Sequence, residues 1–501
     1  MTAAGFNTIP GNLVAPIITF EVNSGGKFSN ESRGLIITHK ATGATMADNV
    51  ATFPASRKEA RQLAGKNSIL SDMYRRMSRA GAQNLWIMAA AASGTAQVRT
   101  ITIDTVPAAG GVGIMGVAGE RLQITLGAGD TVTDAATALA AAINAYYDPL
   151  TEAELPYTAT SALGVVTMTA AHEGAIFEGV DVWVDDTVAN AFDGNVTLAV
   201  TTPGAGDPDL SAALAAIDEQ NWDWIYIPFS DDANFTRYET LLSDVSGRWA
   251  WNQQLYGHVF TAKRASTAAL TTYGDAKDTR HVSTLWSFAD SGDSTPIWGV
   301  LAEQMGRLHN WLSDGANGGV TRGHEGLVAE GQNAPRDVST WPQYETRNTF
   351  VQLGMSTWRV NGVGKVELDK VITHHQTESG APDTVFRDIQ SIAQLTYGLR
   401  KMRADLAFNH SNQISASDDT LNENLPVSTV QDVEGTLTHS YNELVGQGVF
   451  RGARAFGEAV TVTRDADNPN RYNIFAPILR GVPLDVLAAN ATIYTDEIPA
   501  A

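Results

Sequence analysis

The sequence predicts an α/β protein with an interrupted α/β core, an inserted α+β domain, a C-terminal α+β domain and an extended arm at each end. Strand-like and helix-like runs alternate in two separate stretches, and the stretch between them differs in both pattern and charge. The 501 residues are enough for about three domains. The alternation of strands with helices favours a mostly parallel sheet in the core.

The first part of the core is expected at residues 26–95. A strand at 34–39, one or two amphipathic helices within 56–81 and a strand at 84–90 form a βαβ unit. The pattern resumes in the second part, 207–340, where strands recur about every 26 to 32 residues, as in successive βα units. Its strands are expected at 224–229, 255–261 and 281–288, and its helices at 210–219, 235–249, 265–272 and 297–312.

Residues 96–206 separate the two parts of the core and carry 2 Lys+Arg against 13 Asp+Glu, whereas residues 1–95 carry 10 against 5. This step in charge marks a domain boundary. The insert is expected to hold strands at 98–103, 122–126, 165–170 and 180–184 and a helix at 133–147 capped by Thr131 or Thr133. Its many carboxylates predict that most of its faces meet solvent.

The C-terminal domain is expected at 341–480, and residues 481–501 form a final strand or arm. The domain combines a hairpin at 359–373, helices at 383–409 and 430–445, and strands at 459–464 and 472–479, with a further strand at 483–494. Residues 1–25 mix Gly and Pro with one β-prone run, 13–22, which indicates an N-terminal arm that needs a partner sheet.

The composition excludes several classes of function. The chain has no cysteine, which excludes disulfides, thiolate metal sites and a cysteine nucleophile. A net charge of −21 opposes binding to nucleic-acid phosphates. The first 20 residues lack the pattern of a signal peptide and no apolar run reaches 18 residues, so the chain is expected to be made in the cytoplasm without membrane insertion.

Three motifs resemble known functional sites, and each also has a simpler structural interpretation. The segment 111–116, GVGIMG, matches a dinucleotide fingerprint but precedes another strand rather than a helix, which favours a hairpin loop. His374 and His375 are adjacent on a strand and point to opposite faces, which indicates an exposed strand end rather than a metal site. Ser230, Asp231 and Asp232 follow a strand where α/β enzymes place catalytic groups, yet these residue types equally cap the next helix.

No catalytic serine elbow, phosphate loop or zinc-protease helix occurs in the chain, so the sequence predicts no catalytic, cofactor or metal site. The densest positive charge in the acidic C-terminal half is the cluster Arg387, Arg400, Lys401 and Arg403. It is either a solvated helix face or a docking strip for an acidic partner protein.

Several segments resemble the tail sheath proteins of contractile-tailed bacteriophages, in particular the Mu-like group. They are 201–232 (TTPGAGDPDLSAALAAIDEQNWDWIYIPFSDD), 134–149 (DAATALAAAINAYYDP), 167–184 (TMTAAHEGAIFEGVDVWV) and 360–375 (VNGVGKVELDKVITHH). The resemblance covers most of the chain in order and rests on summed similarity rather than on a catalytic signature. It implies that the core has a subtilisin-like topology. Because no matching catalytic serine motif occurs, the resemblance concerns the fold and not a protease activity.

The resemblance also implies a mechanical function. Sheath subunits form hexameric rings stacked helically around a tail tube, and contraction drives the tube through the host envelope. The implied partners are further copies of the chain, the tail tube protein, and the baseplate and tail terminator proteins. The implied location is the phage tail of the virion, after assembly in the host cytoplasm.

Terminal strands are expected to link the subunits, because strand addition uses main-chain hydrogen bonds that can persist while side-chain contacts change. The linking residues are predicted to be Leu13, Val14, Ile17, Ile18, Phe20, Val22, Val460, Val462, Tyr472, Ile474, Leu487, Ile493 and Tyr494. Under this hypothesis, Arg387, Arg400, Lys401 and Arg403 face the tube. The alternatives are an α/β hydrolase-like enzyme that uses the Asp231 region, or a capsid or baseplate protein.

Overall fold

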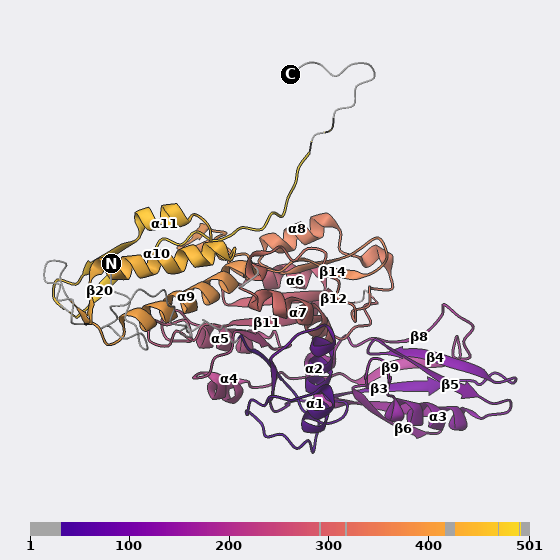
Figure 1. The fold of residues 1–501 in the computed structure, drawn as a ribbon. Coiled ribbons are helices and arrows are strands. Elements are labelled where there is room, and N and C mark those ends of the chain that lie inside the picture. The colour runs from indigo at the N-terminus through magenta and orange to yellow at the C-terminus, as the bar shows by residue number, and fades with distance from the viewer. Residues whose placement is uncertain are drawn as a thin grey trace, which may run out of the picture.

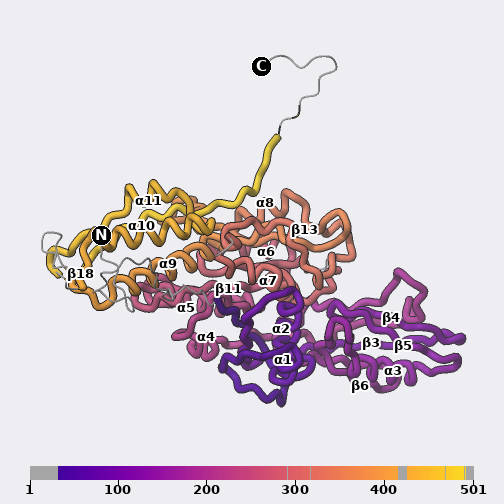
Figure 2. Tube along the Cα trace, viewed as in Figure 1, coloured from indigo at the N-terminus to yellow at the C-terminus, as the bar shows by residue number. Residues whose placement is uncertain are grey.

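A computed structural model describes residues 32–289, 292–315, 318–415, 426–468, 470–489 and 491. The chain forms an elongated molecule in which the α/β core lies between the insert at one end and a group of C-terminal helices at the other (Figure 1). The tube view shows the same order, with the last described residues leaving the body of the molecule (Figure 2).

The core is a five-stranded parallel sheet in the order β12-β11-β10-β1-β2. Its strands are β1 (Gly34–Thr38), β2 (Leu85–Ala89), β10 (Trp224–Tyr226), β11 (His258–Ala265) and β12 (Val282–Phe288). Strand β1 pairs with β2 on one side and with β10 on the other, so the two parts of the core separated in sequence share one sheet. The predicted parallel α/β core is therefore present.

Helices cover both faces of this sheet. Ile36 of β1 packs in the cluster that holds α2 (Ile69–Arg79) and α7 (Ile297–Ser313), while Leu35 and Ile37 point into the opposite cluster. That second cluster contains residues of α4 (Ser211–Ile217), α5 (Asp232–Leu241) and α6 (Thr267–Asp275). The side chains of this buried central strand point alternately to the two faces of the sheet, and both faces are covered by helices. This is the arrangement of a three-layer α/β fold. Helix α1 (Arg57–Ala64) packs on α2.

The insert holds two antiparallel sheets and one helix, α3 (Val132–Ala145). One sheet has the order β6-β7-β3-β9 and the other β5-β4-β8. Their bounds are β3 Ala96–Ile103, β4 Gly111–Val117, β5 Glu120–Leu126, β6 Tyr157–Ala162, β7 Val165–Glu173, β8 Val182–Val184 and β9 Val196–Thr202. Thr131 and Asp134 form a capping box at the start of α3, so Thr131 is the cap rather than Thr133.

The interpretation of segment 111–116 as a hairpin loop was wrong, because this segment is most of strand β4. It pairs with β5 on one side and β8 on the other. Its glycines serve packing: a Cβ on Gly113 would lie 2.5 Å from the ring of Phe192, and one on Gly116 would lie 2.0 Å from the ring of Trp183. Strands β6 and β9 were not expected from the sequence.

The hairpin of β13 (Thr357–Val360) and β14 (Val366–Lys370), with α8 (Tyr344–Gln352), packs against the core. The indole nitrogen of Trp358 donates to the carbonyl oxygen of Trp286 at 2.7 Å. Beyond it, α9 (Ile389–His410) and α10 (Val430–Gly446) lie side by side, followed by α11 (Ala453–Ala459), β19 (Thr461–Arg464) and β20 (Tyr472–Phe475).

Short elements complete the description. Two-residue strands pair as β15 (Thr377–Glu378) with β16 (Ala381–Pro382) and as β17 (Ile414–Ser415) with β18 (Val427–Ser428). Three 3₁₀ turns span Ala175–Phe177, Gly319–Thr321 and Val338–Thr340. Among the described helices, none combines the length and apolar character that a membrane crossing requires.

Two predicted elements differ from the structure. The helix expected at 235–249 ends at Leu241, because the chain then turns and the buried side chain of Arg248 binds carbonyl groups of its surroundings. The strand expected at 483–494 is not formed over 483–489, where the described chain pairs with no other strand, and its later residues lie almost wholly outside the described ranges.

Candidate assembly surfaces

The hairpin of β19 and β20 stands at the end of the C-terminal helices. Asp465 closes its turn by accepting hydrogen bonds from the backbone nitrogens of Asp467 at 3.1 Å and Asn468 at 2.9 Å. Val462 is buried against α10, and its backbone nitrogen donates to the Glu434 carboxylate at 2.9 Å. Helix α10 therefore supports a hairpin that would be marginally stable by itself.

This hairpin forms a sheet of only two strands, so within the described chain neither strand has a second strand as neighbour. Of its apolar residues, Ile474 and Phe475 are exposed, and Phe475 keeps 62% of its surface accessible. Open strand edges with exposed apolar side chains are templates for pairing with another chain. The hairpin has the properties of an acceptor for strand addition.

The chain that follows β20 is anchored to the body through Leu479, Arg480 and Asp485, which pairs with Lys370, and exposes apolar side chains around these contacts. The carbonyl oxygen of Leu479 accepts from the backbone nitrogen of Arg451 at 3.0 Å, and the Arg480 guanidinium pairs with Asp388 at 3.1 Å. After Gly481, the side chains of Leu484, Val486 and Leu487 are exposed, Leu487 by 85%. This segment extends away from the body in Figure 1. An extended apolar segment attached at one end is suited to bind a neighbouring subunit.

The predicted linking residues thus divide into three groups. Val460 and Val462 are buried and support the hairpin, Tyr472 is half-buried, and Ile474 and Leu487 are accessible to a partner. The remaining predicted residues lie outside the described ranges: Leu13, Val14, Ile17, Ile18, Phe20, Val22, Ile493 and Tyr494. Pairing between subunits therefore stays a prediction.

The cationic cluster on and before α9 is largely paired within the chain. Arg400 pairs with Asp223 at 2.6 Å, and Lys401 is buried between Asp405 and Glu443. Although burial opposes it, hydrogen bonds to these two carboxylates raise the pKa of Lys401. The spacing of Lys401 and Asp405, four residues apart on a helix, is the pattern in the sequence that indicates such a pair.

Arg387 and Arg403 complete this cluster. Arg387 lies 3.8 Å from the carboxylate of Asp388, whereas Arg403 is exposed on α9 with no ion pair to any described residue. Of the four residues, Arg403 thus offers the most accessible positive charge to a partner. The tube-facing role of Arg387, Arg400, Lys401 and Arg403 remains a prediction.

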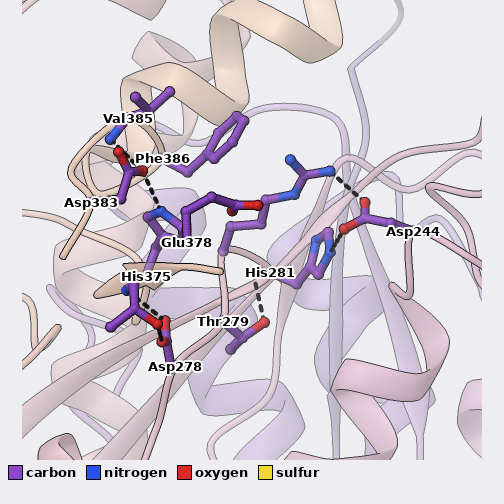
Figure 3. Close-up of a pocket in the computed structure, with 11 residues that line it drawn as sticks. Asp244, Asp278, Thr279, His281, His375, Glu378, Asp383, Val385 and Phe386 are labelled. Atoms are coloured by element: carbon purple, nitrogen blue, oxygen red, sulfur yellow. Dashed lines mark hydrogen bonds and ion pairs between the residues drawn. The ribbon is translucent and has the colours of Figure 1, made fainter. Parts of the chain in front are cut away.

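A polar pocket of about 570 Å³ lies between the core and the segment 373–388 that leads into α9 (Figure 3). His281 lies 3.3 Å from Asp244, and His375 lies 2.6 Å from Asp383. Burial lowers the pKa of His281, and the hydrogen bond from His375 lowers the pKa of Asp383. The pocket therefore contains two histidine–carboxylate pairs.

The position of this pocket favours a structural role. His281 directly precedes β12, so the pocket lies at the amino ends of the strands, whereas active sites of open parallel sheets lie at the carboxyl ends. Asp278 accepts hydrogen bonds from the backbone nitrogen of Gln376 at 2.8 Å and from the hydroxyl of Thr377. These contacts attach the segment before α9 to the core.

The prediction that His374 and His375 form an exposed strand end was wrong, because both are buried, His374 completely. His374 hydrogen-bonds with the Thr284 hydroxyl at 2.7 Å, while His375 turns to Asp383. Burial lowers the pKa of His374 to about 3. No group of three or more histidine or acidic side chains in the described parts of the chain is placed to hold a metal ion.

The group after β10 is a helix cap. Asp231 accepts a hydrogen bond from the backbone nitrogen of Asn234 at 2.9 Å and begins α5, as the sequence indicates. Asp232 pairs with Lys277 at 2.7 Å, and this hydrogen bond lowers the pKa of its carboxyl group. Both carboxylates are thus engaged in stabilising helix α5 and its contact with the core.

A comparison with curated proteins finds a relative in Haemophilus influenzae, the Mu-like prophage FluMu tail sheath protein. It is 24% identical over 492 residues, which cover 94% of this chain and 95% of the relative. The resemblance to Mu-like tail sheath proteins stated from the sequence is therefore confirmed. No protein-family model matches the chain.

A comparison with solved structures finds further sheath proteins. A sheath tail protein from Desulfitobacterium hafniense has 13% identity and a TM-score of 0.48, with 92% of this chain and 96% of that chain covered. The Listeria innocua sheath tail protein has 12% identity and a TM-score of 0.48, with 91% and 93% covered. The anti-feeding prophage helical sheath in its contracted state has 12% identity and a TM-score of 0.46, with 96% and 99% covered.

Proposed function

We propose that this chain, a relative of the Mu-like phage tail sheath proteins, is the structural subunit of a contractile tail sheath. The observation that carries the proposal is the similarity to a tail sheath protein along nearly the whole of both chains. The aligned range includes the core, the insert and the C-terminal helices. The similarity therefore extends over all the domains of the chain rather than over one of them. The core is proposed to have the subtilisin-like topology of this family but not the catalytic activity of subtilisin.

The functional surfaces are proposed to be the two ends of the chain. Residues 13–22 and 487–494 would add strands to the 459–479 hairpin of a neighbouring subunit. The two-stranded sheet of β19 and β20, the exposed Phe475 and the exposed Leu487 support this proposal. Strand addition would keep subunits linked while their side-chain contacts change during contraction.

The assembly is proposed to consist of hexameric rings stacked helically around the tail tube, between a baseplate and a tail terminator protein. Contraction would drive the tube through the host envelope. The subunit would be assembled in the host cytoplasm and remain in the virion, with no nucleic-acid or membrane partner and no enzymatic activity. In this arrangement the domain 341–480 faces the tube and the acidic insert 96–206 faces outward.

Deletion of residues 1–22 tests the arms. We expect the shortened protein to remain folded and monomeric, because the described core does not include these residues. Sedimentation velocity and negative-stain electron microscopy would show single particles instead of sleeves. A variant with Leu13, Ile17 and Phe20 replaced by Ser keeps the chain length as a control, and tubular assembly by both variants would contradict the proposal.

Charge reversal tests the tube-facing strip. Arg403→Glu is the informative variant, because reversing Arg400 or Lys401 would also break ion pairs inside the subunit. We expect Arg403→Glu to weaken co-sedimentation with preassembled tail tubes while the sheath subunits still associate. Unchanged binding to tubes at low and moderate salt would exclude this role for Arg403.

A further inference from the structure

Another pocket, of about 380 Å³, lies against helix α8, and we call it the α8 pocket. Five residues of α8 line it, at positions 344, 347, 348, 351 and 352. This spacing places them on one face of the helix. The hairpin of β13 and β14, the segment that leads into α9, and residues 324–325 and 485–486 supply the other walls. The volume is in the range of small-molecule sites.

His324 lines the α8 pocket without a hydrogen-bond partner. The residue keeps 3% of its surface accessible, and its Nε2 atom is buried with no partner among the described residues. Burial lowers its pKa to about 3, so at neutral pH the ring is uncharged and has one donor and one acceptor nitrogen. A buried polar group left unpaired costs free energy. A group that enters the pocket from solvent can supply the missing partner.

Two arginines of the same pocket have donors that the described chain does not use. Arg347 pairs with Asp369 at 2.7 Å through a terminal nitrogen, while its Nε is buried without a partner. Arg387 lies 3.8 Å from Asp388, which is too long for a hydrogen bond, and its Nε is also buried and unpaired. The planar fork of a guanidinium matches two oxygens of a carboxylate or a phosphate.

The carboxylates that line the pocket are already paired with cations. Glu325 lies 2.7 Å from Arg359, and Asp485 pairs with Lys370. The third lining carboxylate belongs to the arginine pair described above. An anion that enters therefore meets the weakly paired guanidinium of Arg387 rather than an unpaired negative charge.

The pocket extends from an exposed rim to a buried end. Val486 at the rim is 74% exposed, whereas His324 is almost fully buried. A free small molecule can pass the rim and reach His324. A side chain presented by another subunit would first have to displace the segment that holds Asp485 and Val486. The depth of the pocket therefore favours a small free ligand over a protein partner.

We infer that the α8 pocket binds a small oxyanion, a free carboxylate or phosphate, held by Arg387, Arg347 and a ring nitrogen of His324. The two arginines supply positive charge and forked donors, and the neutral ring donates one further hydrogen bond. The site lies within a single chain, so the inference goes beyond the proposed function and does not depend on assembly. Because the anion would join α8 to the segment before α9, its binding would stabilise the folded chain.

Titration of the purified chain with sodium phosphate or sodium malonate tests the inference, with sodium chloride at matched ionic strength as the reference. We expect the thermal midpoint to rise with one of the two oxyanions, and calorimetry to give one saturable site. The anion with the larger response identifies the ligand as a phosphate or a carboxylate. Hydrogen exchange should slow in α8 when that anion binds. If neither anion has an effect beyond that of chloride, the inference is wrong.

Variants locate the binding. Arg387→Gln should weaken binding of the preferred anion by at least about 10-fold, because the anion loses a charged donor. Arg454→Gln is the matched control, since Arg454 is an exposed cation of α11 outside the pocket, and its affinity should equal that of the unmodified chain. Equal weakening by both variants would indicate general screening of surface charge and overturn the inference.

His324→Phe separates binding from folding. Phenylalanine keeps an aromatic ring but removes both nitrogens, so the thermal midpoint in chloride should be unchanged or higher, because no unpaired polar group remains. Anion binding should nevertheless weaken. Undiminished binding by this variant and by Arg387→Gln would exclude the α8 pocket as the site. If one variant does not fold in chloride, the other decides, because they remove different contacts of the anion.

Discussion

Several buried histidines lie in the interior as neutral imidazoles, because burial lowers their pKa. Burial lowers the pKa of His172, His324 and His374 to about 3 and that of His309 to about 4. In the unfolded chain a histidine has a pKa of about 6.5, so between these values the unfolded state binds more protons than the folded state. The stability these residues contribute is therefore complete above pH 6.5 and is lost as the pH falls.

His374→Gln tests this linkage. Each such histidine should reduce the free energy of unfolding by about 1.4 kcal/mol between pH 7.5 and pH 5.5, since pH 5.5 is one unit below the unfolded pKa. The variant should be less stable at pH 7.5, because it loses the bond to Thr284, yet its denaturation midpoint should fall less on acidification. An identical pH dependence in both proteins would contradict the assignment.

Arg248 is a buried cation whose hydrogen-bond partners are carbonyl groups. Burial lowers its pKa to about 10, so it remains protonated at neutral pH. Arg248→Met should lower the free energy of unfolding by about 3 kcal/mol, because several carbonyls lose a charged donor. Proteolysis should also become faster within 243–257. Arg454→Met, at an exposed surface pair, should leave both the thermal midpoint and the cleavage pattern unchanged.

At the scale of elements, replacing glycine by alanine should change the stability of the chain in opposite directions in β4 and in α10. Gly116 allows the Trp183 ring to lie over β4, so Gly116→Ala should destabilise the insert by about 1 to 3 kcal/mol through overpacking. Gly435 lies within α10 with open space around its missing side chain, so Gly435→Ala should stabilise the chain by about 1 kcal/mol. Thermal denaturation of the two variants should shift in opposite directions, and a shift in the same direction would exclude this explanation.

At the scale of the whole molecule, Arg76 connects the insert to the core. Its buried guanidinium lies 3.0 Å from Asp72 on the same helix, 3.2 Å from Glu303 of α7 and 3.8 Å from Glu120 of the insert. Burial alone would raise the pKa of Asp72, but Arg76 and Arg75 hold it below its ordinary value. Burial raises the pKa of Glu303, which Arg76 partly offsets. One cation therefore joins three elements.

Arg76→Met should destabilise the chain by about 3 to 5 kcal/mol, because it leaves carboxylates buried without their partner. Hydrogen exchange should increase in β4 and β5 as well as in α2, since the contact between insert and core is weakened. Arg57→Met is the matched control, because Arg57 also joins the core to the insert, through Glu152, but at the surface. Equal effects of the two variants would argue against a special role for the buried network.

The type and order of most helices and strands could be predicted from the sequence. Strand and helix alternation predicted the α/β core and the separate insert, and residue type and position predicted the cap at Asp231. The periodic apolar residues of α9 and α10 predicted both helices, although α9 begins six residues later than expected. These features depend on hydrogen bonds and side-chain spacing within a few residues, and such interactions can be read from neighbouring positions.

Tertiary structure decided the features that depend on residues far apart. It placed β1 beside β10 across the insert, buried His374 against Thr284, paired Arg400 with Asp223 and left Trp251 exposed. Each depends on which distant surfaces meet, and the same local pattern is compatible with either a buried or an exposed side chain. The sequence by itself determined the kind of protein and its elements, whereas packing decided which charges and aromatic groups remain available to a partner.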